Sequence, residues 1–179
     1  MTGLWVKPYW GFATVRFGNN AIFPAGSGGF TGASSMNRKD LLLSVLACAD
    51  GRTYTPAQIQ KAMFLLSKRM PQLVQEGPNF GFTPYDFGPF DAAVYQEADH
   101  LQRSGEAVIT PSGYGNWRTY AASGEGVVRG RRLLEQLSPQ QRDYVVKVSD
   151  WVRAQSFNSL VKAIYDAYPE MKVNSIFRG

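Results

Sequence analysis

The sequence predicts a mainly α-helical protein with a winged-helix-like core: three helices, a two-stranded β-wing, and then two or three further helices. Two observations lead to this fold class. Helix-capping residues and apolar residues at helical spacing recur through most of residues 36–179. A single pair of short strand-like segments, joined by a glycine-containing turn, follows the third helix.

Residues 1–35 differ in composition from the rest of the 179-residue chain. They hold seven glycines, seven aromatic residues and no acidic residue, and they lack a helical period. This N-terminal extension either forms a small hairpin over "GFATVRFGNNAIF" or is not part of the natural protein, whose start is then Met36. In both cases we expect residues 36–179 to fold as a single domain.

Two helices open this domain. The first is an apolar helix over residues 38–49. The second, over residues 55–70, begins with a capping box in which Thr55 is the N-cap, Pro56 the first helical residue and Gln58 the third. Its apolar residues recur at helical spacing and are expected to face the core: Ile59, Met63, Leu66 and Met70.

A loop over residues 71–88 leads to the third helix, over residues 90–103, in which Asp91 favours the helix start. Residues 106–122 then read as two strands and a short turn, which form the wing. The expected inner stripe of the third helix consists of Val94, Ala98 and Leu101.

Capping residues also mark the helices after the wing. Ser123 is the expected N-cap of a helix over residues 124–137, and Ser138 opens a second capping box before residues 139–155. A last helix is expected from about residue 158 to residue 168.

The most distinctive stretch is "FTPYDFGPF", residues 82–90. Pro84 and Pro89 fix their own φ angles, and Gly88 permits a backbone geometry that other residues avoid. We therefore interpret residues 83–90, called the elbow below, as a stiff extended connection that is pinned by aromatic side chains. The elbow either sets the angle of the third helix for a function or is only a well-packed loop.

The elbow and the helix after it resemble the Panacea family, also described as SocA-like antitoxins and phage-associated proteins. The resemblance covers roughly residues 38–105 and includes "QIQKAMFLLSKR" and "YDFGPFDAAVYQEADHLQRSG". Thr83 and Pro84 stand where the family often has a tryptophan. The matching positions are Lys61, Met63, Phe64, Tyr85, Gly88, Pro89 and Tyr95.

This resemblance implies a small helical domain that binds other proteins and has no catalytic centre. Family members neutralise a toxin encoded by a neighbouring gene, and one hands its toxin to a protease. We therefore expect a protein-binding, antitoxin-like regulator in which the elbow and the acidic third helix form the contact surface. The expected partner-binding residues, which could equally belong to the core, are Tyr85, Phe87, Gly88, Pro89, Phe90 and Tyr95.

The sequence offers little for catalysis, metal binding or a cofactor. His100 is the only histidine, and the only cysteine, Cys48, lies in an apolar run and is expected to be a buried thiol. Asp91, Glu97 and Asp99 on the third helix read as a solvated acidic face. We therefore expect no enzyme, although a hydrolase built around His100 stays open as a weaker alternative.

Nucleic acid is the main alternative partner, for a DNA-binding regulator that uses the wing. Residues 36–179 carry a net charge of only +3, and the acidic third helix would repel phosphates. A basic and aromatic cluster could still contact a DNA backbone: Trp117, Arg118, Arg129, Arg131 and Arg132. These arginines could instead lie on a solvated helix face, with Glu125–Arg129 and Arg131–Glu135 pairs.

The cellular setting follows from what the chain contains. No run of about 18 apolar residues is present, so we expect no membrane partner. A single cysteine fits a reducing, cytoplasmic compartment.

Overall fold

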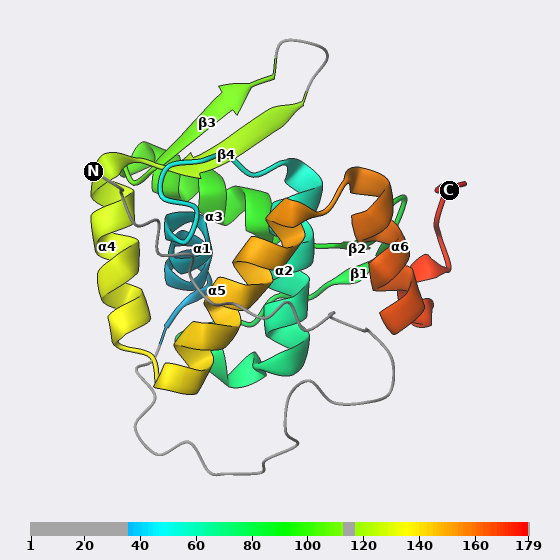
Figure 1. Cartoon of the computed structure of the whole chain (residues 1–179), viewed down its shortest axis with the longest axis horizontal. Coiled ribbons are helices and arrows are strands. Elements are labelled where there is room, and N and C mark those ends of the chain that lie inside the picture. Colours follow the sequence, from blue (N-terminus) through cyan, green and yellow to red (C-terminus); the bar gives the residue numbers. More distant parts are fainter. Residues whose placement is uncertain (1–35, 113–116, 179) are drawn as a thin grey trace, which may run out of the picture.

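The computed structural model describes residues 36–112 and 117–178, so the predictions for residues 1–35 lie outside the described residues. Within the described ranges the protein is mainly helical and has two small antiparallel hairpins (Figure 1). The elements are α1 (Arg38–Ala47), α2 (Pro56–Arg69), η1 (Pro71–Leu73), β1 (Thr83–Tyr85), β2 (Gly88–Phe90), α3 (Ala92–Arg103), β3 (Ala107–Pro111), β4 (Arg118–Ala122), α4 (Gly124–Glu135), α5 (Pro139–Ala154), α6 (Phe157–Ala167) and η2 (Pro169–Lys172).

The predicted fold class is confirmed: α1, α2 and α3 are followed by the wing, β3–β4, and then by α4, α5 and α6. The helices begin where local capping chemistry places them. Thr55 and Ser138 each form the predicted capping box. Ser123 accepts a hydrogen bond from the Gly126 amide at the start of α4.

Helix α1 lies in the centre of the protein, and every residue from Leu41 to Ala47 is buried. It packs against α3, α4, α5 and β4 (Figure 1). Tyr54 fixes α1 to α5, because its hydroxyl donates to the Val45 carbonyl at 2.8 Å and lies 2.5 Å from the Ser149 hydroxyl. The Arg153 guanidinium covers the Tyr54 ring at 5.4 Å.

Helix α4 approaches the wing so closely that only glycine fits at the contact. A methyl group added to Gly126 would lie 1.8 Å from the Glu106 carbonyl oxygen. Beside this contact, the Arg129 guanidinium bridges Asp40 of α1 at 2.6 Å and Glu106 at 2.5 Å. Helix α4 is thereby tied to both α1 and the base of the wing.

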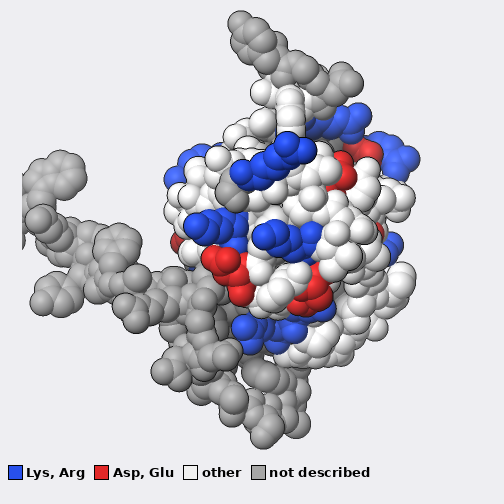
Figure 2. Space-filling model, turned by 90° about the vertical axis from the view of Figure 1, so that its right-hand side faces the viewer, with Lys and Arg blue, Asp and Glu red and all other residues white. Residues whose placement is uncertain are grey.

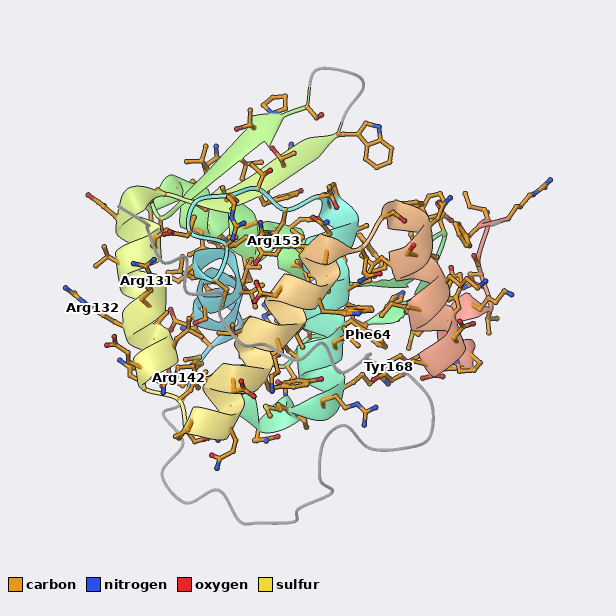
Figure 3. All side chains as sticks on the ribbon, viewed as in Figure 1. Phe64, Arg131, Arg132, Arg142, Arg153 and Tyr168 are labelled. Carbon is orange, nitrogen blue, oxygen red and sulfur yellow. The ribbon has the colours of Figure 1, made fainter. Side chains whose placement is uncertain are left out.

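Helix α2 packs on the other side against α5 and α6. The Phe64 ring meets the Tyr168 ring edge-on at 4.9 Å, at the end of α6 (Figure 3). This aromatic contact extends the core toward the elbow.

The prediction of a loop over residues 71–88 is wrong, because this stretch contains η1 and the strand β1. The elbow is a β1–β2 hairpin, in which Pro84 lies opposite Pro89. Antiparallel strands alternate between pairs that exchange hydrogen bonds and pairs that do not. Two prolines can therefore face each other at a pair of the second kind without losing a ladder bond. Prolines usually argue against a strand, so the sequence hid this hairpin.

Candidate functional site

The elbow is held from the inside by two consecutive side chains of α2. The Gln60 side-chain amide donates to the Asp91 carbonyl at 2.9 Å, and its oxygen accepts from the Asp91 amide at 3.1 Å. The Lys61 ammonium donates to the Pro89 carbonyl at 3.4 Å. Helix α2 therefore fixes both β2 and the first residues of α3.

Gly88 lets the elbow backbone lie directly on Lys61. Its φ is +96°, and an added methyl group would lie 3.4 Å from the Tyr165 ring and 3.7 Å from the Lys61 nitrogen. Gly88 and Pro89 are both buried. These two predicted partner-binding residues therefore shape the elbow from within and are not on the exposed surface.

Lys61 is a buried amine without an acidic partner among the described residues. Only 4% of the residue is exposed, and its hydrogen bond to Pro89 is to a neutral carbonyl. Burial lowers the pKa of the Lys61 ammonium to about 8, because removal from water disfavours the charged form. Sequence reasoning noted Lys61 only through the family resemblance and missed its burial.

The outer side of the elbow contacts α6 and the C-terminal segment. The Phe87 ring meets the Phe157 ring of α6 at 5.3 Å. The Ile176 amide donates to the Asp86 carbonyl at 3.0 Å, at the turn between β1 and β2. Phe87 thus faces α6, while the other elbow aromatics turn toward α3.

Those other aromatics form a continuous row, called the aromatic stripe below, that consists of Tyr85, Phe90, Tyr95 and Tyr120. Ring centroids are 5.1 Å apart for Tyr85 and Phe90, 5.8 Å apart for Phe90 and Tyr95, and 5.7 Å apart for Tyr95 and Tyr120. The last two rings are nearly parallel, at 9°. Tyr85 is 54% exposed, and Phe90 and Tyr95 are partly exposed. The stripe therefore extends from the elbow across α3 to the wing.

The stripe ends in a shallow groove of about 310 Å³, called the wing groove below. Its lining residues are Pro56, Tyr95, Trp117, Arg118 and Tyr120. Burial raises the pKa of Tyr120 to about 12 and also raises that of Tyr95, so both hydroxyls stay neutral at ordinary pH. The groove joins Tyr95, predicted for a protein partner, to Trp117 and Arg118, predicted for nucleic acid. Sequence reasoning missed Tyr120, although it lies two residues from Arg118 on one strand, where side chains share a face.

The predicted arginine cluster is divided among several carboxylates. Arg118 lies 3.5 Å from Asp99 of α3, and Arg131 lies 2.9 Å from Asp50 at the end of α1. Arg129 is held by Asp40 and Glu106 as described above. The predicted pairs Glu125–Arg129 and Arg131–Glu135 are therefore wrong, because acids from other elements lie closer than the neighbours on α4.

The described surface shows no single basic stripe on the face that carries α6. There, basic and acidic side chains are interspersed (Figure 2). On α4, Arg132 points away from the body of the protein (Figure 3), and it forms no ion pair with the described residues. Of the four predicted arginines, only Arg132 is thus unpaired within the described part of the chain.

The prediction of a solvated acidic face on α3 is also wrong for two of its three residues. Glu97 is only 8% exposed and pairs with Arg38 of α1 at 3.0 Å. Asp91 caps α3, and its second oxygen accepts from the Gly81 amide at 2.7 Å. Asp99 alone is half-exposed, beside Arg118.

A second cleft, of about 260 Å³, lies beside His100 and contains several ionisable groups. Its lining residues are Asn37, Arg38, Lys39, Glu76, Pro78, Glu97 and His100. The Glu97 carboxylate, already paired with Arg38, lies 3.1 Å from the Nδ1 atom of His100. Among the described residues, no hydroxyl or thiol forms a hydrogen bond with the His100 ring. The Glu97 carboxylate thus orients the imidazole.

The remaining candidates for chemistry are weak. The Cys48 thiol is partly buried and donates to the Ser44 carbonyl at 3.2 Å, and burial raises its pKa to about 12. A thiol this weakly acidic is a poor nucleophile at neutral pH. The described residues contain no group of three or more side chains suited to hold a metal ion. None of their helices has the length and apolar character needed to cross a membrane.

No model of a known protein family matches the chain. No curated protein matches it significantly either. The resemblance to the Panacea family therefore stays a prediction that rests on the residues of α2, the elbow and α3.

Proposed function

We propose that this protein is a non-enzymatic regulator that binds another protein, in the manner of a cytoplasmic antitoxin that neutralises a toxin encoded by an adjacent gene. The observation that carries the proposal is the aromatic stripe, with Tyr85 exposed on a clamped elbow. Large aromatic side chains supply most of the binding energy in many protein interfaces.

The construction of the elbow supports this proposal on energetic grounds. A surface that is already ordered loses little conformational entropy when a partner binds. The elbow backbone is fixed by Lys61 on one side and by the C-terminal segment on the other, and Gln60 fixes the next residue, Asp91. A partner would therefore meet Tyr85 and Phe90 already in place.

The nucleic-acid alternative has less support. Binding to a DNA backbone needs cations that can exchange their counter-ions for phosphates. Arg118, Arg129 and Arg131 each face a carboxylate. A phosphate would have to displace that carboxylate, so we expect weak binding at most, with a shallow dependence on salt.

The experiment is co-purification of the protein with the product of the adjacent gene, followed by measurement of the dissociation constant. We expect Tyr85→Ala to weaken binding by about tenfold or more, since removal of a central aromatic costs about 2 kcal/mol. Val128→Ala is the matched control, because Val128 is equally exposed, at 51%, but lies on α4. Equal affinity of both variants, with both folded, would show that the stripe is not the contact surface.

A further inference from the structure

The two edges of the strand β4 differ in their hydrogen-bond partners. One edge pairs with β3, and the other pairs with Tyr54. The Ser112 amide donates to the Trp117 carbonyl at 2.7 Å, which places Trp117 among the residues that bond to the β3 side. Because bonding direction alternates along an antiparallel strand, Arg118 and Tyr120 point their backbone groups to the other edge. Tyr120 confirms this, since it exchanges both bonds with Tyr54, at 2.7 and 3.0 Å.

The backbone pairing at this second edge consists of the single pair Tyr54–Tyr120 among the described residues. Continuing the antiparallel pairing of Tyr54 with Tyr120 would bring Pro56 opposite Arg118. Pro56, however, is the first residue of α2, where the chain turns away, and proline has no amide hydrogen to donate. The Arg118 amide and carbonyl therefore have no hydrogen-bond partner among the described residues.

A strand that continued the pairing past Tyr54 would run through the wing groove, since Pro56 and Arg118 both line it. We propose that an extended segment of the partner protein binds there by adding to the edge of β4. Its backbone bonds to the amide and carbonyl of Arg118, and one apolar side chain enters between Tyr95, Tyr120 and Trp117. Strand addition of this kind takes affinity from backbone bonds and specificity from side-chain pockets. The inference rests on the proposed function and names the form of the partner.

The charges around the groove favour a peptide with an acidic residue beside the apolar one. Arg118 and Asp99 are each about half-exposed and 3.5 Å apart, so their pair contributes little stability. The Arg118 guanidinium can therefore bind a carboxylate of the partner without a large loss. A nucleic acid strand is disfavoured because Asp99 would lie next to its phosphates.

The test selects peptides that bind the whole 179-residue chain from a displayed library of short random peptides. The best selected peptide is synthesised, and its dissociation constant is measured by fluorescence anisotropy. We expect binders with an acidic residue next to a proline or aromatic residue, and about tenfold weaker binding to Trp117→Ala. Val108→Ala, at an equally exposed site of β3, should bind as the wild type does.

A pair of variants at Arg118 separates the backbone from the side chain. Arg118→Ala removes the guanidinium and keeps the amide hydrogen, whereas Arg118→Pro removes both. The β3–β4 ladder does not use that amide, and the residue opposite, Pro111, is already a proline. We expect Arg118→Pro to bind the peptide about tenfold more weakly than Arg118→Ala, because an unpaired peptide carbonyl is left behind.

Hydrogen exchange of the Arg118 amide in the wild-type protein gives a second readout that needs no variant. The peptide should slow this exchange at least tenfold and leave that of Val108, on the other strand, unchanged. Three results would each overturn the inference. The selection could yield no binder, or oligothymidylate could compete with the peptide at the groove. The peptide could also bind both Arg118 variants equally and leave the exchange of the Arg118 amide unchanged. Partner capture that depends on Tyr85 but not on Arg118→Pro would overturn it while leaving the proposed function intact.

Discussion

The protein contains two antiparallel hairpins that are held in opposite ways. The elbow has strands of three residues, yet α2 bonds the backbone of Pro89 and of the adjoining Asp91, and the C-terminal segment bonds its turn. The wing has strands of five residues, but it projects from the body of the protein (Figure 1). The middle residue of β4, Tyr120, pairs with Tyr54.

The difference shows that strand length does not decide how firmly a hairpin is fixed. A two-stranded ribbon is marginally stable by itself, so its order depends on what packs around it. The elbow is surrounded and therefore suits preformed recognition. Within residues 36–112 and 117–178, the wing keeps one unpaired residue, Arg118, on the β4 edge, which suits the proposed addition of a strand.

The largest expected effect is at Tyr120, in the middle of β4. Tyr120→Ala should lower the free energy of unfolding by about 4 kcal/mol, because it removes a buried ring that stacks on Tyr95. Urea denaturation would measure this loss. Val108→Ala, on the exposed part of the same hairpin, is the control and should cost less than about 0.5 kcal/mol. A loss near that of the control would mean that the wing is not anchored at Tyr120.

The second effect concerns the amine beneath the elbow. The Lys61 pKa falls from 10.5 to about 8 on folding, so below pH 8 both states are protonated and the buried charge opposes folding. Between about pH 8 and 10.5 the unfolded state binds more protons, so the free energy of unfolding should rise with pH, by up to about 3 kcal/mol at 1.36 kcal/mol per pKa unit.

The comparison variant for this effect is Lys61→Met, which keeps a similar volume without a charge. Its stability should not rise over this pH range, and at pH 7 it should be at least as stable as the wild type. The comparison also removes the opposing contribution of Cys48, Tyr95 and Tyr120, which both proteins share and whose raised pKa values make stability fall at higher pH. Parallel pH profiles for the two proteins would show that Lys61 is not a buried charge.

A smaller loss is expected when the elbow turn is altered. Gly88→Ala should cost about 2 kcal/mol, because a side chain at a φ of +96° is strained, whereas its methyl group would only touch the Tyr165 ring at 3.4 Å. Gly77→Ala is the control, since Gly77 has a φ of +89° with no atom near the added methyl group. We expect similar losses at the two positions in thermal unfolding, and a much greater loss at Gly88 would show that surrounding elements crowd the methyl group as well.

The smallest expected effect is at the outer end of the wing. Trp117→Ala should change the free energy of unfolding by less than about 0.5 kcal/mol, because the side chain is 58% exposed. Chemical denaturation would check this, together with the loss of peptide binding described above. Strong destabilisation would show instead that Trp117 belongs to the packing of the fold.

Local signals made most of the fold predictable. Thr55 and Ser138 cap helices through residues three positions away, so the sequence alone reveals these starts. The elbow hairpin was missed because prolines on both strands disguise it. The ion pairs were missed because they join residues that are far apart in the sequence. Arg129 pairs with Asp40, 89 residues away, and the neighbours of Arg129 on its helix do not predict that contact.

The candidate site was only partly predictable. Aromatic content singled out Tyr85, Phe90, Tyr95 and Trp117, but their order along one surface depends on how α3 lies between the hairpins. The burial of Lys61 was unpredictable for a similar reason. A lysine within an amphipathic helix normally extends to solvent, and only the position of the elbow over α2 covers this one.

From Leu41 to Ala47, helix α1 has no side that faces water, since every one of these residues is buried. A fragment cut after residue 122 would keep the three helices and the wing but strip away α4 and α5, which cover that helix. The bared leucines would favour aggregation over folding. Shortened versions for binding studies should therefore keep everything through α5, and the winged-helix part is not a separable module.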